Sequence, residues 1–271
     1  MSDIKVAATD LDGTLLRSDG TVSGATRRVL AAVEESGVPV VFVTARPLRW
    51  MDDLWPMVGA HGLAVVSNGA LVYDVAARAV RRVRGLAPEP GLDVVAAVRK
   101  SVPEASFAIE TVEGIRLEAG YPHDRDDHQA PPGSPVGPMD TLWDGPALKL
   151  LVRHPGTDHD GFRERVEQAV GEAAIVTWTV PGLLEISAPG VTKAAALAEV
   201  CADLGVEAAD VVAFGDMPND VPMLTWAGTS YAVSGAHPSA IAAADHLAPS
   251  NDADAVAQVL ARLVPIGADL L

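Results

Sequence analysis

The stretch Asp10-Leu11-Asp12-Gly13-Thr14-Leu15 directly follows the mostly apolar run Ile4-Lys5-Val6-Ala7-Ala8-Thr9. The run predicts a short buried strand, so the two aspartates stand where a strand ends and a loop begins. In open α/β sheets, ligands bind at the carboxyl ends of the strands. Gly13 gives the loop the freedom to bend, so that both carboxylates can face one crevice. A surface turn rich in Asp and Gly is the alternative for this stretch alone, and the rest of the chain argues against it.

The composition is that of an acidic globular protein. The chain has 271 residues, of which 49% are apolar, enough for one large domain or two smaller ones. Asp and Glu outnumber Lys and Arg by 36 to 20, which gives a net charge of −16. Nucleic acids and anionic membranes attract basic surfaces, so we expect neither as a partner. A signal-peptide pattern is absent, and we expect a cytoplasmic protein whose oligomeric state the sequence leaves open.

Strands and helices alternate along two parts of the chain. Residues 23–35 have the apolar period of a helix, which Ser23 can cap, and residues 38–43 predict a buried strand with Thr44 at its carboxyl end. Pro47 is suited to open another helix. The same patterns predict strands at 63–67, 211–214 and 230–233, and helices at 192–204, 221–226, 238–244 and 253–263. Such alternation indicates an α/β fold with a Rossmann-like, doubly wound parallel sheet and right-handed crossovers.

The middle of the chain has a different character. Strands predicted at 107–110, 115–118, 148–152, 175–179 and 184–186 do not alternate strictly with the helices predicted at 92–102 and 160–170. This order is typical of a separate α+β unit. We therefore expect a core domain made of residues 1–85 and 188–271, with an α+β domain inserted at residues 86–187.

Four signals lie along the predicted core, namely Asp10-x-Asp12-Gly13-Thr14, Thr44, Lys193 and Gly215-Asp216-x-x-Asn219-Asp220. In this order they resemble the four motifs of the haloacid dehalogenase (HAD) superfamily of phosphotransferases. The interval from Thr44 to Lys193 is long enough to hold a large α/β cap, as in the Cof-like phosphatase branch. Asn68-Gly69-Ala70 and the run from Glu185 to Ala194 also match that branch. Each motif alone is a weak signal, but the ordered set covers essentially the whole chain.

The resemblance implies a reaction at phosphorus. Asp10 would attack the phosphoryl group and form an aspartyl-phosphate, a type of intermediate known for carboxylate nucleophiles. Asp12 would act as general acid and then general base. HAD phosphatases and mutases keep an aspartate at this second position, whereas dehalogenases and phosphonatases lack it. The implied cofactor is Mg²⁺, a hard cation that prefers oxygen ligands.

The resemblance also implies which residues hold the metal and the phosphate. Asp10, the backbone carbonyl of Asp12 and Asp216 would bind Mg²⁺, and Asp220 would bind it through water or support a ligand. The predicted phosphate-binding residues are Thr44, Lys193 and Asn219, and the predicted substrate or cap contacts are Arg46, Asn68 and Glu185. A lysine at a helix start opposes the helix dipole, which indicates that Lys193 has a role other than a solvated charge.

The sequence therefore predicts a Mg²⁺-dependent phosphatase that hydrolyses a small phosphorylated metabolite, with a sugar phosphate favoured. Two alternatives stay open: a phosphomannomutase-like phosphotransferase, and a sugar-phosphate-binding module without catalysis. A further cluster, His123, Asp124, Asp126, Asp127 and His128, lies in a stretch rich in Pro and Gly. We interpret it as a solvated cap loop, with a second metal site as the alternative.

Overall fold

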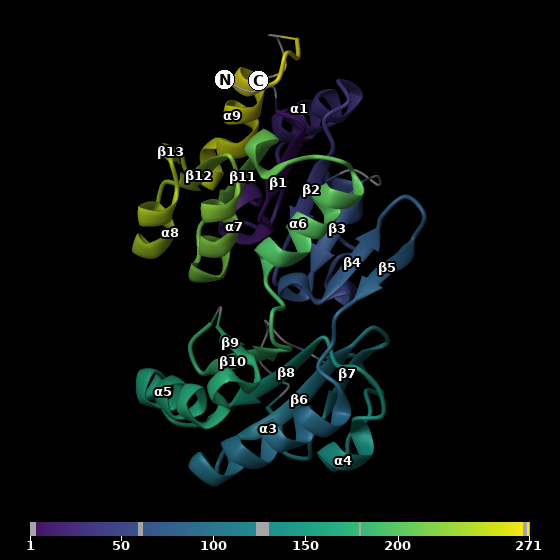
Figure 1. The fold of residues 1–271 in the computed structure, drawn as a ribbon, viewed down its shortest axis with the longest axis vertical. Coiled ribbons are helices and arrows are strands. Elements are labelled where there is room, and N and C mark those ends of the chain that lie inside the picture. The colour runs from purple at the N-terminus through teal and green to yellow at the C-terminus, as the bar shows by residue number, and fades with distance from the viewer. Residues whose placement is uncertain (1–3, 59–61, 123–129, 179, 268–269, 271) are drawn as a thin grey trace. The chain divides into compact units, whose positions relative to one another are not determined.

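The computed structural model describes residues 4–58, 62–122, 130–178, 180–267 and 270. The chain forms two compact units, Met1–Arg82 with Thr192–Leu271, and Val83–Val191. Each unit is built around its own sheet (Figure 1). In the described ranges no helix has the length and apolar character needed to cross a membrane. The cluster from His123 to His128 lies outside the described residues.

The first unit contains an eight-stranded sheet in the order β13-β12-β11-β1-β2-β3-β4-β5. The strands from β13 to β3 are parallel, and β4 returns antiparallel to β3. Its strands are β1 (Val6–Thr9), β2 (Val40–Val43), β3 (Leu63–Val66), β4 (Leu71–Asp74), β5 (Ala79–Val83), β11 (Val211–Gly215), β12 (Thr229–Val233) and β13 (His246–Ala248). Its helices are α1 (Gly24–Glu35), α2 (Trp55–Val58), α6 (Lys193–Asp203), α7 (Val221–Trp226), α8 (Pro238–Ala243) and α9 (Ala255–Leu263).

Strand β1 lies at the centre of this sheet and marks a topological switch point. The chain runs from β1 through α1 to β2 on one side, and from β11 through α7 to β12 on the other. Right-handed crossovers in opposite directions place α1 and α7 on opposite faces of the sheet. Consistent with this, α1 contacts α9, while α7 contacts α6 and α8. Because helices cover both faces, central strands such as β2 are buried along their whole length.

The second unit contains an antiparallel sheet in the order β7-β6-β8-β10-β9. Its strands are β6 (Ser106–Thr111), β7 (Gly114–Leu117), β8 (Lys149–Arg153), β9 (Ile175–Thr177) and β10 (Leu183–Ser187), and its helices are α3 (Pro88–Ser101), α4 (Met139–Leu142) and α5 (His159–Val170). Alternate residues of the strands, such as Phe107, Ile109 and Leu150, share one apolar core with α3 and α5. The opposite face carries a smaller cluster that includes Leu117, Tyr121 and Leu151.

The doubly wound α/β fold predicted from the sequence is confirmed. Local signals also placed α1 correctly, because Ser23 Oγ accepts a hydrogen bond from the N–H of Thr26 at 2.9 Å. Pro47 differs from expectation, since it precedes only a 3₁₀ turn, Leu48–Trp50, before the short α2. The edge strand β13 was not predicted, because it has three residues and Leu247 in its centre is 61% exposed, so no apolar alternation marks it.

Candidate active site

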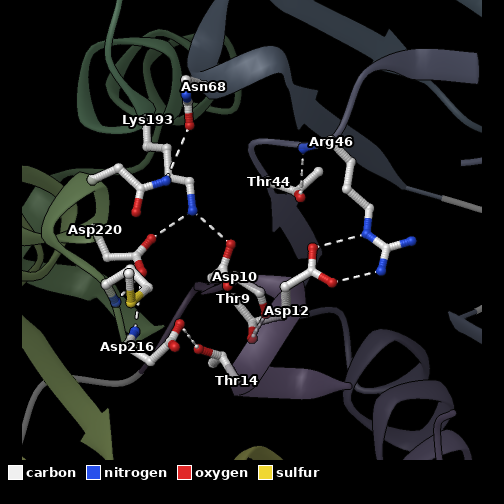
Figure 2. Close-up of polar contacts among 12 residues, drawn as sticks. Thr9, Asp10, Asp12, Thr14, Thr44, Arg46, Asn68, Lys193, Asp216 and Asp220 are labelled. Atoms are coloured by element: carbon white, nitrogen blue, oxygen red, sulfur yellow. Dashed lines mark hydrogen bonds and ion pairs between the residues drawn. The ribbon is translucent and has the colours of Figure 1, made fainter. Parts of the chain in front are cut away.

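The predicted motif residues of the first unit meet at the carboxyl edge of its parallel sheet (Figure 2). Asp10 follows β1, Thr44 follows β2, and Asp216 follows β11. The paired registers of β1 with β11 and with β2 bring these three strand ends side by side. Lys193 is the first residue of α6, whose N-cap Thr192 accepts a hydrogen bond from Ala195. This edge is where open α/β sheets bind ligands.

Lys193 lies between two carboxylates. Its Nζ is 2.5 Å from Asp10 Oδ1 and 2.6 Å from Asp220 Oδ1. The side chains are almost completely buried, with exposed fractions of 1% for Lys193, 6% for Asp10 and 0% for Asp220. A buried lysine at a helix start is tolerated here because two negative groups compensate its charge.

Burial and mutual repulsion govern the protonation of the carboxylates. Desolvation raises the pKa of Asp10 well above its ordinary value; Lys193 opposes this rise, and Asp220 and Asp216 reinforce it. Desolvation and the charge of Asp220 likewise raise the pKa of Asp216 to about 6. Desolvation acts to lower the pKa of Lys193, but Asp10 and Asp220 outweigh it, so the lysine stays charged. Carboxylates crowded in this way are stabilised by a bound cation.

The acidic residues fit a hard divalent cation. Asp10, Asp216 and Asp220 each offer an oxygen within 4.8 Å of the others. Oδ1 of Asp216 accepts a hydrogen bond from Thr14 Oγ1 at 3.0 Å, which orients the carboxylate. Asp220 is already engaged, since Oδ1 contacts Lys193 and Oδ2 accepts hydrogen bonds from the N–H groups of Asp216 and Met217. This favours Asp10 and Asp216 as direct ligands and Asp220 as a support.

Gly13 permits the close packing beneath this acidic group. Its φ is +77°, and a Cβ added there would lie 2.4 Å from Asp216 Oδ2. Any other residue would therefore be strained in its backbone and would displace a predicted metal ligand. The predicted bend after Asp12 is thus coupled to the position of Asp216.

Asp12 differs from Asp10 because it is 53% exposed. Arg46 donates to it from two nitrogens, Nε to Oδ2 at 2.8 Å and Nη2 to Oδ1 at 2.5 Å. The main chain of Arg46 is also fixed, because its N–H donates to Oγ1 of the buried Thr44 and its carbonyl accepts from the N–H of Ser67. We predicted Arg46 as a substrate contact, which stays a prediction; its guanidinium here holds Asp12.

Asn68 and Asn219 are joined, with Asn219 Nδ2 donating to Asn68 Oδ1 at 3.1 Å. Ser67 and Asn68 both have positive φ, 52° and 56°, a conformation that is uncommon in non-glycine residues and concentrates at functional sites. Within the described residues, the buried atoms Ser67 Oγ and Asn219 Oδ1 have no hydrogen-bond partner. Gly69 lets this turn reach α6, since a Cβ there would lie 2.3 Å from the Thr192 carbonyl.

Glu185 belongs to the second unit and lies on β10. Its Oε1 is 2.5 Å from Lys149 Nζ of β8, and the two side chains are only 5% and 2% exposed. The same unit has a cavity of about 300 Å³ lined by residues that include His159, Arg163 and Trp178. None of the site residues predicted from the sequence lines it.

Two residues that contact predicted site residues were given no role from the sequence. Thr14 was quoted as part of a motif but given no role, although it orients Asp216. Lys149 was read only as part of a strand, although it pairs with Glu185. The Gly-Thr that follows the two aspartates was the available signal for Thr14. For Lys149 the available signal was its charge in an otherwise apolar predicted strand, because a charge requires a partner when it is buried.

Known proteins resemble this chain over nearly its whole length. A family model described as haloacid dehalogenase-like hydrolase matches residues 7–260. An HMP-PP phosphatase from Cronobacter sakazakii is 28% identical over 257 residues, covering 90% of this chain and 89% of the relative. The 5-amino-6-(5-phospho-D-ribitylamino)uracil phosphatase YcsE from Bacillus subtilis is 28% identical over 260 residues, covering 95% of both chains. The crystal structure of SMU.1108c from Streptococcus mutans matches with a TM-score of 0.84 at 23% identity, covering 96% of this chain and 98% of that one.

Proposed function

This chain belongs to the haloacid dehalogenase-like hydrolase family, and we propose that it is a Mg²⁺-dependent phosphatase that hydrolyses a small phosphorylated metabolite through an aspartyl-phosphate. The observation that carries the proposal is the buried contact of 2.5 Å between Asp10 and Lys193, beside Asp216 and Asp220. Two curated relatives named as phosphatases support the reaction type. The unit Val83–Val191 is proposed to act as the inserted cap that the sequence predicts at residues 86–187.

The first half of the reaction uses Asp10 and Asp12. A carboxylate oxygen of Asp10 forms a bond to phosphorus while the bond from phosphorus to the ester oxygen breaks. Asp12, in its protonated form, gives its proton to the departing oxygen, so that an alcohol leaves. Acid–base assistance of this kind is worth about 10²–10⁴ in rate. Lys193 favours the ionised form of the nucleophile and offsets negative charge on the phosphoryl oxygens.

The second half regenerates the enzyme. The Asp12 carboxylate takes a proton from water as the water oxygen bonds to phosphorus, and the bond to Asp10 breaks. The products are inorganic phosphate, the ionised Asp10 and a protonated Asp12. Thr44 and Asn219 are proposed to hold the phosphoryl oxygens, and Asn68 positions Asn219 through its hydrogen bond of 3.1 Å.

Mg²⁺ fits the donor set, because Asp10 and Asp216 are carboxylates and carboxylates are preferred ligands of this ion. The proposed ligands are Asp10, the Asp12 carbonyl and Asp216, with Asp220 supporting them. When bound, the ion would neutralise the charge that otherwise keeps an anionic nucleophile from an anionic phosphate.

The substrate is proposed to carry a phosphorylated sugar or sugar alcohol. One relative is named for a substrate that contains a phospho-D-ribityl group, which agrees with the sugar phosphate favoured from the sequence. Glu185 is proposed as a cap residue. Its ion pair with Lys149 makes it a fixed polar group on the inserted unit's sheet.

Phosphate release from a panel of sugar phosphates, phosphoribityl compounds, nucleotides and HMP-PP tests the proposal. Each would be run with Mg²⁺, with chelator, and with Asp10→Asn. This variant should fold, because Lys193 retains Asp220 at 2.6 Å, and it should release no phosphate. Asp52→Asn, an exposed aspartate in the same unit, is the matched control and should remain active. Retained activity in Asp10→Asn would refute the mechanism. If the folded wild-type protein releases no phosphate from any compound of the panel, the proposed phosphatase activity is refuted.

A further inference from the structure

We infer that Arg46 is a positioning residue for Asp12, and that its forked contact aims the carboxyl group that exchanges protons with the leaving group and with water. This inference rests on the proposed phosphatase reaction and adds a residue that acts through Asp12. It is carried by the two hydrogen bonds of 2.8 Å and 2.5 Å from one guanidinium to both oxygens of one carboxylate.

Asp12 needs such a partner because its surroundings do not fix it. Its side chain is 53% exposed, whereas that of the nucleophile Asp10 is 6% exposed and held by Lys193. An exposed aspartate samples several rotamers. A proton donor must nevertheless lie about 2.6–3.2 Å from the atom it serves, and a misplacement of about 1 Å can reduce the rate about 10²-fold.

Arg46 is itself anchored to two strand ends. Its N–H donates to Thr44 Oγ1 at 3.0 Å, beyond β2, and its carbonyl accepts from the Ser67 N–H at 2.9 Å, beyond β3. Thr44 and Ser67 are both 0% exposed. The main chain of Arg46 is therefore part of the rigid edge of the sheet. Its planar guanidinium, which donates two hydrogen bonds to Asp12, extends that rigidity to the carboxylate.

A contribution to folding stability does not account for the ion pair between Arg46 and Asp12. Ion pairs between exposed side chains contribute only about 0–1 kcal/mol. The forked geometry instead sets the plane of the carboxyl group. When Asp12 carries the proton for the leaving oxygen, its other oxygen still accepts a hydrogen bond, so Arg46 can hold the group through both halves of the reaction. Lysine, a point charge, cannot reproduce this fork.

Leaving-group dependence separates this role from substrate binding. The wild-type enzyme, Arg46→Lys and Arg46→Gln would be assayed on an alkyl phosphate, whose leaving oxygen needs a proton, and on 4-nitrophenyl phosphate, whose leaving oxygen needs little assistance. We expect kcat on the alkyl ester to fall on the order of 10²-fold in both variants, with KM changing much less. On the nitrophenyl ester we expect kcat/KM, which reports the first half of the reaction, to fall only about 3-fold, well below the 10²–10⁴ of lost acid catalysis.

A double-mutant cycle with Asp12→Asn completes the test. Replacing Arg46 in that background should lower kcat on the alkyl ester no further, because the carboxyl group that Arg46 would position is absent. Arg49→Lys is the matched control; that guanidinium lies 4.8 Å from the centre of the Trp50 ring, and its replacement should leave both esters unaffected.

Three outcomes would overturn the inference while leaving the phosphatase intact: equal losses of kcat/KM on both esters, a rise in KM at constant kcat, or losses that multiply in the double variant. A wild-type protein that hydrolyses neither ester nor any member of the metabolite panel would overturn the proposed function, and the role of Arg46 with it. Circular dichroism of each variant verifies that the fold is retained.

Discussion

Lys193 Nζ lies 2.5 Å from Asp10 Oδ1, although the two residues are 183 positions apart in the chain. The contact joins the end of β1 to the start of α6, so it fastens together the two segments of the first unit that the second unit separates. Both partners are buried, and Asp220 completes the group. Lys193, proposed to bind the phosphate, is therefore also a structural residue.

Lys193→Met should lower both stability and activity. Removing the cation leaves two carboxylates buried without compensation, and breaking a buried ion pair destabilises a fold by about 3–5 kcal/mol. Equilibrium unfolding in urea measures this. Lys5→Met is the matched control, because Lys5 pairs with Asp210 at 2.6 Å but its side chain is 57% exposed, and we expect a loss within about 1 kcal/mol. Equal losses in the two variants would contradict the structural role of Lys193.

Gly13→Ala should weaken metal-dependent activity. The new Cβ would lie 2.4 Å from Asp216 Oδ2 at a φ of +77°. Gly20→Ala isolates the backbone effect, because Gly20 has a φ of +78° and nothing within 4 Å of its Cβ position. Both variants should lose about 1–2 kcal/mol of stability. Only Gly13→Ala should also raise the Mg²⁺ concentration needed for half-maximal phosphate release, by about 10–100-fold. An unchanged Mg²⁺ requirement would show that Asp216 does not bind the metal.

Glu34 should make stability decrease with pH. Burial raises the pKa of this carboxyl from its ordinary 4.5 to about 7, although a hydrogen bond from the Val40 N–H opposes the shift. The folded state therefore binds the proton more tightly than the unfolded state, so the free energy of unfolding falls as pH rises from about 4.5 to about 7. Because the side chain is partly exposed, we expect a fall of about 1–2 kcal/mol.

Glu34→Gln should remove this component, since a glutamine stays neutral and can still accept from Val40. Urea unfolding of the wild type and of the variant at pH 5 and pH 8 gives the difference between their pH dependences. Glu35→Gln, at the exposed neighbouring position, should leave the wild-type dependence unchanged. Parallel curves for the wild type and Glu34→Gln would refute the assignment.

Lys149 and Glu185 should behave as a coupled pair in unfolding. Lys149→Met removes the cation that compensates the buried Glu185 carboxylate, and we expect a loss of about 3–5 kcal/mol. The double variant Lys149→Met with Glu185→Leu should recover much of that loss, because apolar residues can replace a buried ion pair at little net cost. Additive losses in the double variant would show that the contact of 2.5 Å contributes no coupling energy.

Much of the fold could be predicted from local pattern, and the candidate site residues from the resemblance of the ordered motifs to the HAD superfamily. Strand β1 and the helix after Ser23 follow from apolar periodicity and capping, and parallel strands align their carboxyl ends at one edge of the sheet. That is why Asp10, Thr44 and Asp216 could be grouped without coordinates. Where local pattern is weak, as in β13 and in the turn after Pro47, prediction failed because tertiary packing, not propensity, forms those elements.

By itself, the sequence determined the doubly wound fold, because the fold depends on periodicity, and it indicated the residues gathered at the strand ends, because their ordered motifs resemble those of the HAD superfamily. Only the tertiary structure decided the pairings within that set: Lys193 between Asp10 and Asp220, Thr14 on Asp216, and Arg46 on Asp12. These contacts join side chains from separate strand ends, and their partners are chosen by burial, reach and charge in three dimensions. Spacing along the chain measures none of these three quantities.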